Sequence, residues 1–504
     1  MVKRARLATF PAVTAISLEP EMDEPLYKQL YDGLRRAILT GEMEANTRLP
    51  SSRILADELA VSRNTVVNAF DQLIAEGYLE SRVGDGTYVA HTLPDELLHV
   101  TTEAKTAPRH DQHISRRGLS RRGAMLSQTA VCSPRRLTAH EYPIPFRAGL
   151  PAYDAFPFDV WARLEARLWR DPLQELVTYG NPAGYEPLRE AIAAYLNTAR
   201  GVHCKPDQII IVSGSQQALT LSGMVLLDPG DVAWIEEPGY LGARAALIGA
   251  SARLVPVPVD EEGIVVSEGI AREPTARLAY VSPSHQHPLG VTMSLSRRLA
   301  LLEWAAGANA WILEDDYDSE YRYTSRPLAA LQGLDRAGCV IYIGTFSKVM
   351  FPGLRLGYMV VPPDLVEAFV SARAIMDRHS PLPEQAVLAE FIGEGHFANH
   401  IRRMRALYAT RQAALIQSIR EYAPIIEANP ADAGMHLIGW LPLGMDDKIA
   451  AEAAATYEID VAPLSIYRLQ AGGRGGLLLG YAALDEATIR DGVQRLAEAL
   501  RTVR

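Results

Sequence analysis

The sequence predicts a chain of two folded parts: a small α-then-β unit near the N-terminus and a large α/β domain with a mostly parallel sheet. Three observations support this prediction. The chain has 504 residues, which is too long for one ordinary core. Residues 25–90 hold short helical patterns followed by an alternating hairpin pattern. From residue 143 to 504, short apolar runs alternate with amphipathic helical patterns, the order typical of an α/β domain.

The composition is that of an ordinary globular protein, with 48% hydrophobic and 22% charged residues. No stretch has the apolar length of a membrane span. Three widely spaced cysteines indicate neither a disulfide framework nor a metal site, which favours a reducing cytoplasm. The formal net charge of −10 argues by itself against nucleic-acid binding, so the distribution of charge matters more than its sum.

Two segments lack the apolar periodicity of folded structure. Residues 1–24 are interpreted as an N-terminal arm, and residues 91–142 as a basic flexible linker. Within that linker, residues 105–136 carry eight Lys and Arg side chains against one Asp. Residues 1–90 carry 10 basic and 13 acidic side chains, so any nucleic-acid affinity of that unit must come from placed contacts and the linker.

The first element of the small unit is an amphipathic helix over residues 25–41. It opens with Pro25, closes at Gly41, and repeats leucine or isoleucine every four residues. A second, short helix is expected from Ser51 or Ser52 to Leu59. Ser62 then caps a third helix that ends at Gly77, so two short helices flank a tight turn in a helix-turn-helix arrangement.

A two-stranded wing follows, because LESRVGDGTYVA alternates apolar and polar residues about a Gly-Asp-Gly turn. The start of the third helix is where a recognition helix meets base edges, and glycines let the wing backbone approach a duplex. The predicted DNA-binding residues are Arg53, Ser62, Arg63, Asn64, Thr65, Gly84 and Gly86. A small helical subdomain with polar surface residues is the alternative for any one of them.

In the large domain, six apolar runs are strand candidates. They are long enough for a strand and apolar on both faces, as a sheet covered on both sides requires. The candidates are residues 208–214, 232–238, 277–283, 310–316, 339–345 and 355–361.

The chemistry of this domain centres on TFSKVMFPGLRLGY, residues 345–358. Lys348 directly follows a strand and can form a Schiff base with an aldehyde cofactor. Ser347 and Arg355 can hold a phosphate on that cofactor. A surface lysine is the alternative for an isolated Ser-x-Lys pattern, so other residues must converge on the same site.

Four further residues or motifs follow other strand candidates. Asp315, in ILEDDYDSEYRY, could keep a pyridine nitrogen protonated, and Tyr317 could hydrogen-bond a phenolic oxygen; a metal site or an acidic turn is the alternative. SGSQQAL offers Ser215 and Gln216 at a helix start as an anion cradle. Tyr240, in EEPGY, could stack on the ring or be a packed aromatic residue.

Both parts resemble known families. PSSR, ELAVSRNTV, AEGYLE and GDGTYV, in this order, resemble the winged helix of the GntR family. YGNPAGYEPLREAIAAYL, SGSQQAL, EEPGY, SPSHQHPLG, EDDYDSEY and TFSKVMFPGLRLGY resemble a fold-type I aminotransferase over nearly all of residues 143–504. The fusion of the two resembles the MocR/GabR-type transcriptional regulators.

This resemblance implies pyridoxal 5′-phosphate as the cofactor, with Lys348 as the Schiff-base lysine. It implies Asp315 at the ring nitrogen, Tyr317 at the phenolic oxygen, and Tyr179 contributed by a partner subunit. The phosphate would lie near Ser215, Gln216, Ser347 and Arg355. The implied assembly is a homodimer, head-to-tail, with exchanged DNA-binding domains, and the implied partners are promoter DNA and a small amine or amino acid.

The sequence departs from the enzyme pattern at the expected effector end of the site. His287–Pro288 stands where many aminotransferases have Asn-Pro. The run LLLGYA, residues 477–482, lacks the arginine with which many of these enzymes hold a substrate carboxylate. His287, Arg468 and Arg474 are therefore the predicted effector contacts, and either arginine could instead be a surface residue.

Three functions remain open at this level. The first is a regulator in which an effector amine exchanges with the Lys348 aldimine and so changes DNA binding. The second is an aminotransferase that the N-terminal unit only tethers to DNA. The third is a DNA-binding protein whose large domain is only a dimerisation scaffold.

Overall fold

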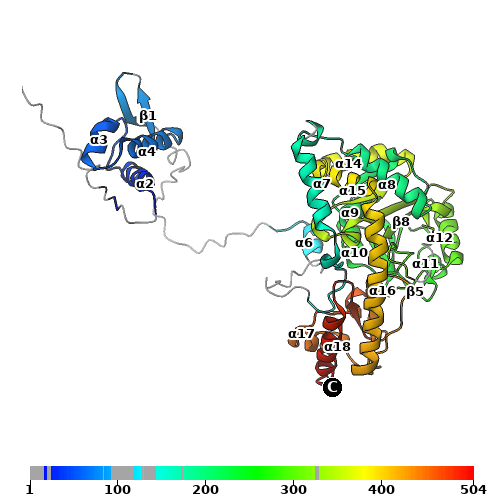
Figure 1. Ribbon diagram of the computed structural model, residues 1–504. Helices are drawn as coiled ribbons and strands as arrows, with labels where there is room; N and C mark the ends of the chain where they lie inside the picture. Colours follow the sequence, from blue (N-terminus) through cyan, green and yellow to red (C-terminus); the bar gives the residue numbers. More distant parts are fainter. Residues whose placement is uncertain are drawn as a thin grey trace, which may run out of the picture. The chain divides into compact units, whose positions relative to one another are not determined.

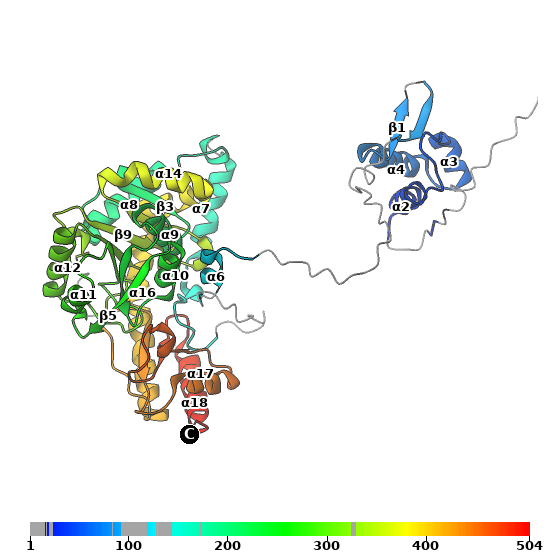
Figure 2. The same cartoon turned by 180° about the vertical axis from the view of Figure 1, so that it is seen from behind.

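The computed structural model describes residues 16, 18–19, 24–82, 84–91, 118–127, 129, 144–171, 174–323 and 329–503. The chain divides into two compact units, residues 1–116 and 117–504 (Figure 1, Figure 2). Most of the predicted N-terminal arm and of the predicted basic linker lies outside the described residues. Among the described residues, no helix has both the length and the apolar character needed to cross a membrane.

The N-terminal unit is the predicted winged helix-turn-helix. Its elements are α2 (Leu26–Leu39), α3 (Ser52–Glu58), α4 (Arg63–Ala75), β1 (Leu79–Arg82) and β2 (Gly86–Val89). The two strands pair antiparallel, with Leu79 opposite Val89 and Arg82 opposite Gly86. The helices pack through a small core that includes Leu34, Leu55 and Phe70. This core holds the start of α4 and the wing as one surface unit.

The large unit is built on an eight-stranded sheet of order β3-β10-β9-β8-β7-β4-β5-β6. Neighbouring strands from β9 to β5 run parallel, and β10 runs antiparallel to both β3 and β9. The mostly parallel sheet is therefore confirmed. Its strands are β3 (Ile209–Val212), β4 (Val232–Glu237), β5 (Arg253–Asp260), β6 (Gly263–Ile264), β7 (Leu278–Val281), β8 (Trp311–Asp316), β9 (Val340–Thr345) and β10 (Gly357–Val360).

Alternate residues of each central strand face opposite helical layers. In β8, Leu313 joins a core with helices α9 (Ser215–Leu226), α10 (Leu241–Gly249) and α14 (Val366–Asp377). Its neighbour Ile312 joins another core with α11 (Val266–Arg272) and α12 (Leu295–Ala308). Both faces of the sheet are thus covered, which explains why these strands read as unbroken apolar runs.

Strand β5 was not among the predicted strands, because Pro256 and Pro258 interrupt its sequence. Its ladder to β4 covers residues 253–258, whereas β6 pairs only with Val259 and Asp260. The carbonyls of both prolines point away from β4, where they accept hydrogen bonds from Arg272 and Val265. The missing N–H groups therefore fall on the side that lacks a full partner strand, where proline is tolerated.

The remaining helices pack around the largest core of the unit, which contains Trp161, Leu188, Phe391, Tyr408 and Leu496. They are α7 (Phe158–Arg170), α8 (Glu186–Ala199), α15 (Leu382–Gly393) and the long α16 (His396–Tyr422). A C-terminal three-stranded sheet of order β11-β13-β12 follows. Its elements, with two helices, are β11 (His436–Trp440), α17 (Asp447–Thr456), β12 (Ala462–Pro463), β13 (Gly476–Gly480) and α18 (Glu486–Arg501).

A short helix that the sequence analysis did not predict lies inside the predicted linker. Helix α6 (Arg121–Ser127) packs against α10 of the large unit. The approach is close at Gly249, where an added Cβ would lie 3.3 Å from Leu126 Cδ2. The cavity described next is lined by Leu241 and Gly242 at the start of α10, whereas α6 approaches Gly249 at the other end of that helix.

Candidate functional site

A cavity of about 370 Å³ lies at the carboxyl ends of the parallel strands in the large unit. This edge is where open α/β sheets hold their ligands, because the loops after the strands converge there. Its wall includes Ser215 after β3, Tyr240 after β4, His287 after β7, Asp315 in β8 and Lys348 after β9. The structure therefore brings together residues that the sequence analysis selected from five separate motifs.

Lys348 lies in the short helix α13 (Phe346–Val349), and its side chain reaches into the cavity. Its Nζ donates a hydrogen bond to the Gly149 carbonyl oxygen at 2.8 Å. Burial lowers the pKa of Lys348, although the nearby Asp318 and Asp315 oppose that shift. A buried lysine with a lowered pKa is a nucleophilic amine, the group needed to bond an aldehyde carbon.

Asp315 is the one carboxylate of the Glu-Asp-Asp run that lines the cavity. Its Oδ2 accepts a hydrogen bond from the Tyr280 hydroxyl at 2.9 Å, and its Oδ1 is buried without a partner. Burial raises the pKa of this carboxyl to about 7. The unpartnered Oδ1 is an acceptor that a protonated ring nitrogen would satisfy.

The other two carboxylates of the run are structural. Glu314 accepts backbone hydrogen bonds from Leu331 and Gln332 at 2.7 and 2.8 Å. Asp316 forms a buried ion pair with Arg200 at 2.6 Å. Successive side chains of a strand point to opposite faces of the sheet, so Asp315 points away from both Glu314 and Asp316. Neither a shared metal site nor a solvated acidic turn fits this arrangement.

An anion cradle forms where β3 leads into α9. Gly214 adopts a φ of 108°, and α9 begins at Ser215 with its first amides directed at the cavity end. The Arg355 guanidinium lies beside this turn, with Nη1 and Nη2 3.7 Å from the position of a Cβ on Gly214. The Ser347 Oγ is buried without a partner. Helix amides, a guanidinium and an unpartnered hydroxyl fit a phosphate group.

The side chain of Gln216 does not have the anion-binding role that was expected. Its side-chain Nε2 donates to the Gly242 carbonyl oxygen at 3.0 Å, so the amide group braces the start of α10. The residue still lines the cavity at the first turn of α9. Its backbone rather than its side chain is therefore the part suited to an anion.

Aromatic rings form the wall beyond Lys348. The ring centroids of Tyr240 and His287 lie 5.6 Å apart, and those of His287 and Tyr467 lie 5.2 Å apart, both edge to face. The Tyr317 hydroxyl lies 3.0 Å from His285 Nδ1. Tyr317 and His287 thus lie on the wall where they were expected, and Tyr467 is a neighbour that the sequence did not single out.

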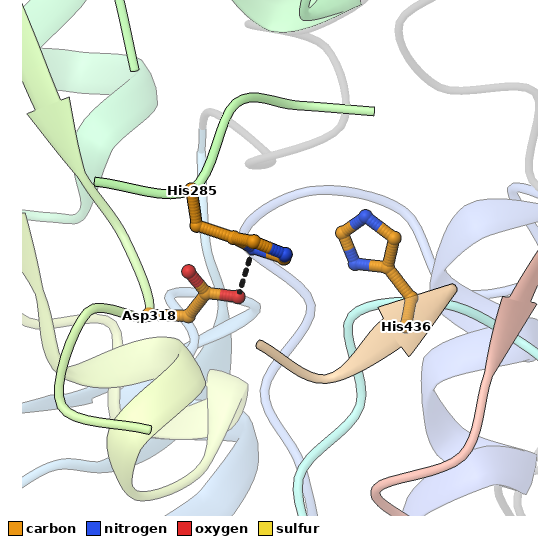
Figure 3. A group of neighbouring side chains, drawn as sticks. All are labelled: His285, Asp318 and His436. Atoms are coloured by element: carbon orange, nitrogen blue, oxygen red, sulfur yellow. Dashed lines mark hydrogen bonds and ion pairs between the residues drawn. The ribbon is translucent and has the colours of Figure 1, made fainter. Parts of the chain in front are cut away.

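His285, Asp318 and His436 form a buried group that the sequence analysis missed (Figure 3). Asp318 Oδ2 lies 3.0 Å from His285 Nδ1, so the carboxylate orients that imidazole. His436, on β11, lies across from this pair, and its Nε2 donates to the Pro288 carbonyl oxygen at 3.2 Å. The sequence held a partial signal, because His285 and Asp318 belong to two selected motifs. His436 lies far along the chain, and only the fold brings it near.

Three predicted residues lie outside this cavity. Tyr179 is 79% exposed, under the Arg378 guanidinium, whose carbon lies 4.6 Å from the ring centroid. The Arg468 Nη2 donates to the Arg474 carbonyl oxygen at 2.8 Å. Arg474 donates to the Leu441 carbonyl oxygen at 2.7 Å and pairs with Glu427 at 2.6 Å. Both arginines are thus held by groups outside the cavity.

In the winged helix, the predicted contact residues lie on α3, at the start of α4 and in the turn of the wing. Arg53, Arg63 and Asn64 are exposed on α3 and at the start of α4. Ser62 and Thr65 are engaged with each other: the Ser62 Oγ accepts from the Thr65 amide at 3.1 Å and lies 2.8 Å from its Oγ1. Ser62 is therefore first of all the N-cap of α4. Gly84 and Gly86 adopt φ of 79° and 125°, which the turn of the wing requires.

Two wing arginines were not singled out in the sequence. Arg48 lies against the wing, with Nε 3.1 Å from the position of a Cβ on Gly86. Arg82 stacks on Tyr88, its guanidinium carbon 4.3 Å from the ring centroid. Both belong to irregular or strand segments, where no helical periodicity marks the exposed face.

Comparison with known families separates the same two units. Residues 26–89 match the family of bacterial regulatory proteins, gntR family. Residues 143–496 match the aminotransferase class I and II family.

Relatives of the whole chain combine both units. The chain is 43% identical to the "Probable rhizopine catabolism regulatory protein MocR" of Rhizobium meliloti, over 96% of this chain and 95% of that protein. It is 32% identical to the HTH-type transcriptional regulator TauR of Rhodobacter capsulatus, over 97% of this chain and 99% of that protein.

A solved structure resembles the large unit. It is LysN, the α-aminoadipate aminotransferase of Thermus thermophilus, in complex with N-(5′-phosphopyridoxyl)-L-leucine. The two share 30% identity with a TM-score of 0.69, covering 75% of this chain and 97% of that one.

Proposed function

Because this chain belongs to the aminotransferase class I and II family and to the MocR-type helix-turn-helix regulators, we propose that it senses a small amine at a pyridoxal-phosphate site and thereby adjusts its binding to DNA. The single observation that carries the proposal is the Lys348 amine, buried in a cavity beside three groups suited to that cofactor. These are the unpartnered oxygens of Asp315 and Ser347 and the Arg355 guanidinium.

Different residues of the cavity would bind different groups of the cofactor. Asp315 Oδ1 would accept from the protonated ring nitrogen, because Oδ2 is already taken by Tyr280. The first amides of α9, Ser347 and Arg355 would hold the phosphate. The Tyr317 hydroxyl, fixed beside His285, would lie toward the phenolic oxygen. Tyr240 lines the cavity from the start of α10, where its ring can cover the cofactor ring.

When bound, the cofactor supplies an aldehyde carbon that reacts reversibly with primary amines. An effector amine would compete with Lys348 for that carbon. A displaced Lys348 amine would return to the Gly149 carbonyl oxygen, its partner at 2.8 Å. Gly149 lies in the segment that enters the large unit, so exchange at Lys348 would alter a contact close to the linker.

The proposed DNA surface is the start of α4 together with the wing. Arg63 and Asn64 are exposed at the N-terminal end of α4, where side chains reach base edges in the major groove. Arg53 on α3 and the wing backbone at Gly84 and Gly86 would contact phosphates. Arg48 and Arg82 join this surface as wing cations.

The proposed assembly is a head-to-tail homodimer in the cytoplasm, in which Tyr179 reaches the partner's cavity. Residues 158–179 carry four exposed large apolar side chains, which a dimer contact would cover. They are Phe158, Trp169, Val177 and Tyr179, exposed by 49, 50, 60 and 79%. The molar mass of the cofactor-loaded protein, measured by light scattering, tests this part of the proposal.

The central test uses the full-length protein loaded with pyridoxal phosphate and the DNA upstream of its own gene. A panel of amines and amino acids is screened by cofactor absorption, and each hit is then added to a DNA-binding titration. The proposal requires that amines which change the absorption also change DNA affinity. Hits that change absorption and leave DNA affinity unaltered, at several salt concentrations, would contradict it.

The same samples distinguish the two other functions. Steady conversion of an amino acid and a keto acid, at ordinary enzymatic rates, would identify an aminotransferase. Failure of the purified protein to take up pyridoxal phosphate would identify a dimerisation scaffold. Either result would replace the sensing proposal.

A further inference from the structure

The buried group of His285, Asp318 and His436 joins three segments that are far apart in the sequence (Figure 3). His285 follows β7, Asp318 follows β8, and His436 lies on β11. The three residues are 2, 1 and 3% exposed, and one nitrogen or oxygen of each lies within 4.8 Å of those of the other two. Imidazole nitrogens and carboxylate oxygens are ligands that proteins use for divalent transition metals such as Zn²⁺. What this group binds depends on which of its atoms already have partners.

The hydrogen bond to Asp318 leaves one nitrogen of His285 as a bare acceptor. The Asp318 Oδ2 lies 3.0 Å from His285 Nδ1, and an ionised carboxylate only accepts, so Nδ1 carries the proton of the neutral ring. The other nitrogen, Nε2, then has a lone pair, and this atom is buried without a partner. A carboxylate that fixes the tautomer of an imidazole in this way is the common outer partner of a metal-binding histidine.

The Pro288 carbonyl fixes the tautomer of His436 in the same way. Its oxygen lies 3.2 Å from His436 Nε2 and only accepts, so Nε2 is protonated and Nδ1 is bare in the neutral ring. A second proton is disfavoured, because the buried His436 ring packs against the His285 and His287 rings, with centroids 5.1 and 5.4 Å away. Figure 3 shows the nitrogen-bearing edge of His285 turned toward the His436 ring. Two bare nitrogens thus belong to facing rings, and neither can donate to the other.

The packing of His285 keeps its ring from turning away to another partner. A Cβ on Gly290 would lie 3.1 Å from His285 Nε2, and a Cβ on Gly434 would overlap the ring. The Tyr481 hydroxyl fixes Gly434 by donating to its carbonyl oxygen at 3.0 Å. A partner for the bare Nε2 must therefore come to the place where this nitrogen lies, because a buried acceptor without one destabilises the fold.

The local charge favours a cation over a water molecule as that partner. Asp318 and Asp315 are both buried and both act on the Lys348 amine, so the two carboxylates share that ammonium. A water molecule can donate to both bare nitrogens but adds no charge. A divalent cation accepts both lone pairs and also supplies positive charge beside the buried carboxylates.

We propose that His285 Nε2 and His436 Nδ1 bind a divalent transition-metal ion such as Zn²⁺, and that Asp318 orients His285 as the outer carboxylate. Neighbouring ligands of a tetrahedral zinc ion lie about 3.3 Å apart, so a shift of His436 on the order of 1 Å closes the site. Because His436 lines the cavity, water from the cavity completes the coordination. The ion joins β11 to the segments after β7 and β8. This inference does not rest on the proposed sensing function.

Zinc binding is measured on the full-length, cofactor-loaded protein. The protein carries no affinity tag and is freed of unbound cofactor, because both would bind zinc. A chromophoric zinc chelator competes with the protein, so the titration gives the number of sites and their affinities. His285→Gln and His436→Gln each remove one ligand, and glutamine at 436 can still donate to the Pro288 carbonyl oxygen. His203→Gln, at an exposed histidine, is the matched control.

The parent and His203→Gln should each bind one zinc ion that both ligand variants bind more than about 100-fold more weakly. Asp318→Asn should weaken the same site by about tenfold, because loss of an outer partner typically costs about 10–100-fold in metal affinity. Mg²⁺ should not compete, since it prefers oxygen ligands. Equal zinc titrations of the parent and both ligand variants would mean adventitious binding only and would overturn the inference. A parent that bound no zinc would overturn it as well.

A second measurement needs no substitution, so it remains decisive even where a variant fails to fold. X-ray absorption at the zinc edge of the parent, loaded with one equivalent of zinc, reports the ligands directly. Two imidazoles per zinc ion, with Zn–N distances of about 2.0 Å, are expected. A site with one imidazole or none, or with sulfur from a cysteine, would overturn the assignment. Neither result changes the sensing proposal, which depends on Lys348.

Discussion

The winged helix and the cofactor cavity differ in the exposure of their functional residues and in how far apart those residues lie in the sequence. The proposed DNA contacts of the N-terminal unit are exposed, and they lie within about forty residues of sequence on one small core. The cavity residues are buried or half-buried, apart from the exposed Arg355, and they come from segments as far apart as Ala148 and Leu478. Among the described residues, every buried side-chain polar atom without a partner belongs to the large unit. Two of these atoms, Asp315 Oδ1 and Ser347 Oγ, belong to residues that line the cavity, where a ligand can satisfy them.

The largest effect should come from removing one of these unsatisfied groups in the cofactor-free protein. Burial raises the pKa of Asp315 from 3.8 to about 7, so the folded state binds its proton more tightly than the unfolded state. The associated stability is complete below pH 4 and is lost as the pH rises through about 7. Asp315→Asn should therefore be more stable than the parent by about 4 kcal/mol at pH 8, and equal to it near pH 4.

Tryptophan fluorescence suits this measurement, because all six tryptophans lie in the large unit. Urea unfolding of the full chain at pH 4 and pH 8 would report on that unit alone. Asp364→Asn, at an exposed carboxylate, is the control and should show no such pH dependence. If the two variants showed the same pH dependence, the burial of the ionised Asp315 would not lower the free energy of unfolding. The proposed energetic difference between the two units would then be wrong.

The next effect concerns the covalent hold on the cofactor. Lys348→Ala should release pyridoxal phosphate on dialysis, with an apparent affinity about 100-fold weaker, because only noncovalent contacts remain. Retained absorption after dialysis measures this loss. Lys448→Ala, at an exposed lysine, should retain the cofactor. The response of DNA binding to amines should weaken with Lys348→Ala and persist with Lys448→Ala. A Lys348→Ala protein that held the cofactor as firmly as the parent would contradict the assignment of that lysine.

A smaller effect, confined to DNA binding, is expected for a substitution in the winged helix. Arg63→Ala should weaken specific DNA binding by about tenfold, since one base-edge or phosphate contact is lost at the start of α4. Cofactor absorption and its change with amines should stay as in the parent. Arg36→Ala, exposed on α2, is the matched control for the loss of one positive charge. Fluorescence anisotropy with labelled DNA at two salt concentrations separates the two variants; equal losses would point to net charge rather than a placed contact.

The two regions also differ in how far the sequence could predict them. The helix-turn-helix and its wing were predicted almost residue by residue, because caps, turns and apolar spacing are all local signals. The cofactor end of the cavity was predicted as well, since its residues lie in or next to recognisable strands. The effector end was not, because its wall depends on contacts between distant segments. Arg468 and Arg474 illustrate this: their backbone and carboxylate partners are set by the fold, and so is the position of His436 beside His285.

The smallest effect concerns Ser62. The sequence predicted it as a DNA contact, whereas in the structure it caps helix α4. Ser62 accepts a hydrogen bond from the Thr65 amide and so caps α4. Ser62→Ala should destabilise that helix by about 1 kcal/mol, whereas Ser62→Asn should restore it, because asparagine is an equally good cap. Peptide-resolved hydrogen exchange over residues 63–75 of the full chain measures both. If DNA affinity followed the same pattern as exchange, Ser62 would act on DNA through the position of α4. If Ser62→Asn restored protection from exchange and still lost DNA affinity, the Ser62 hydroxyl itself would be a contact, and the sequence-based assignment would stand.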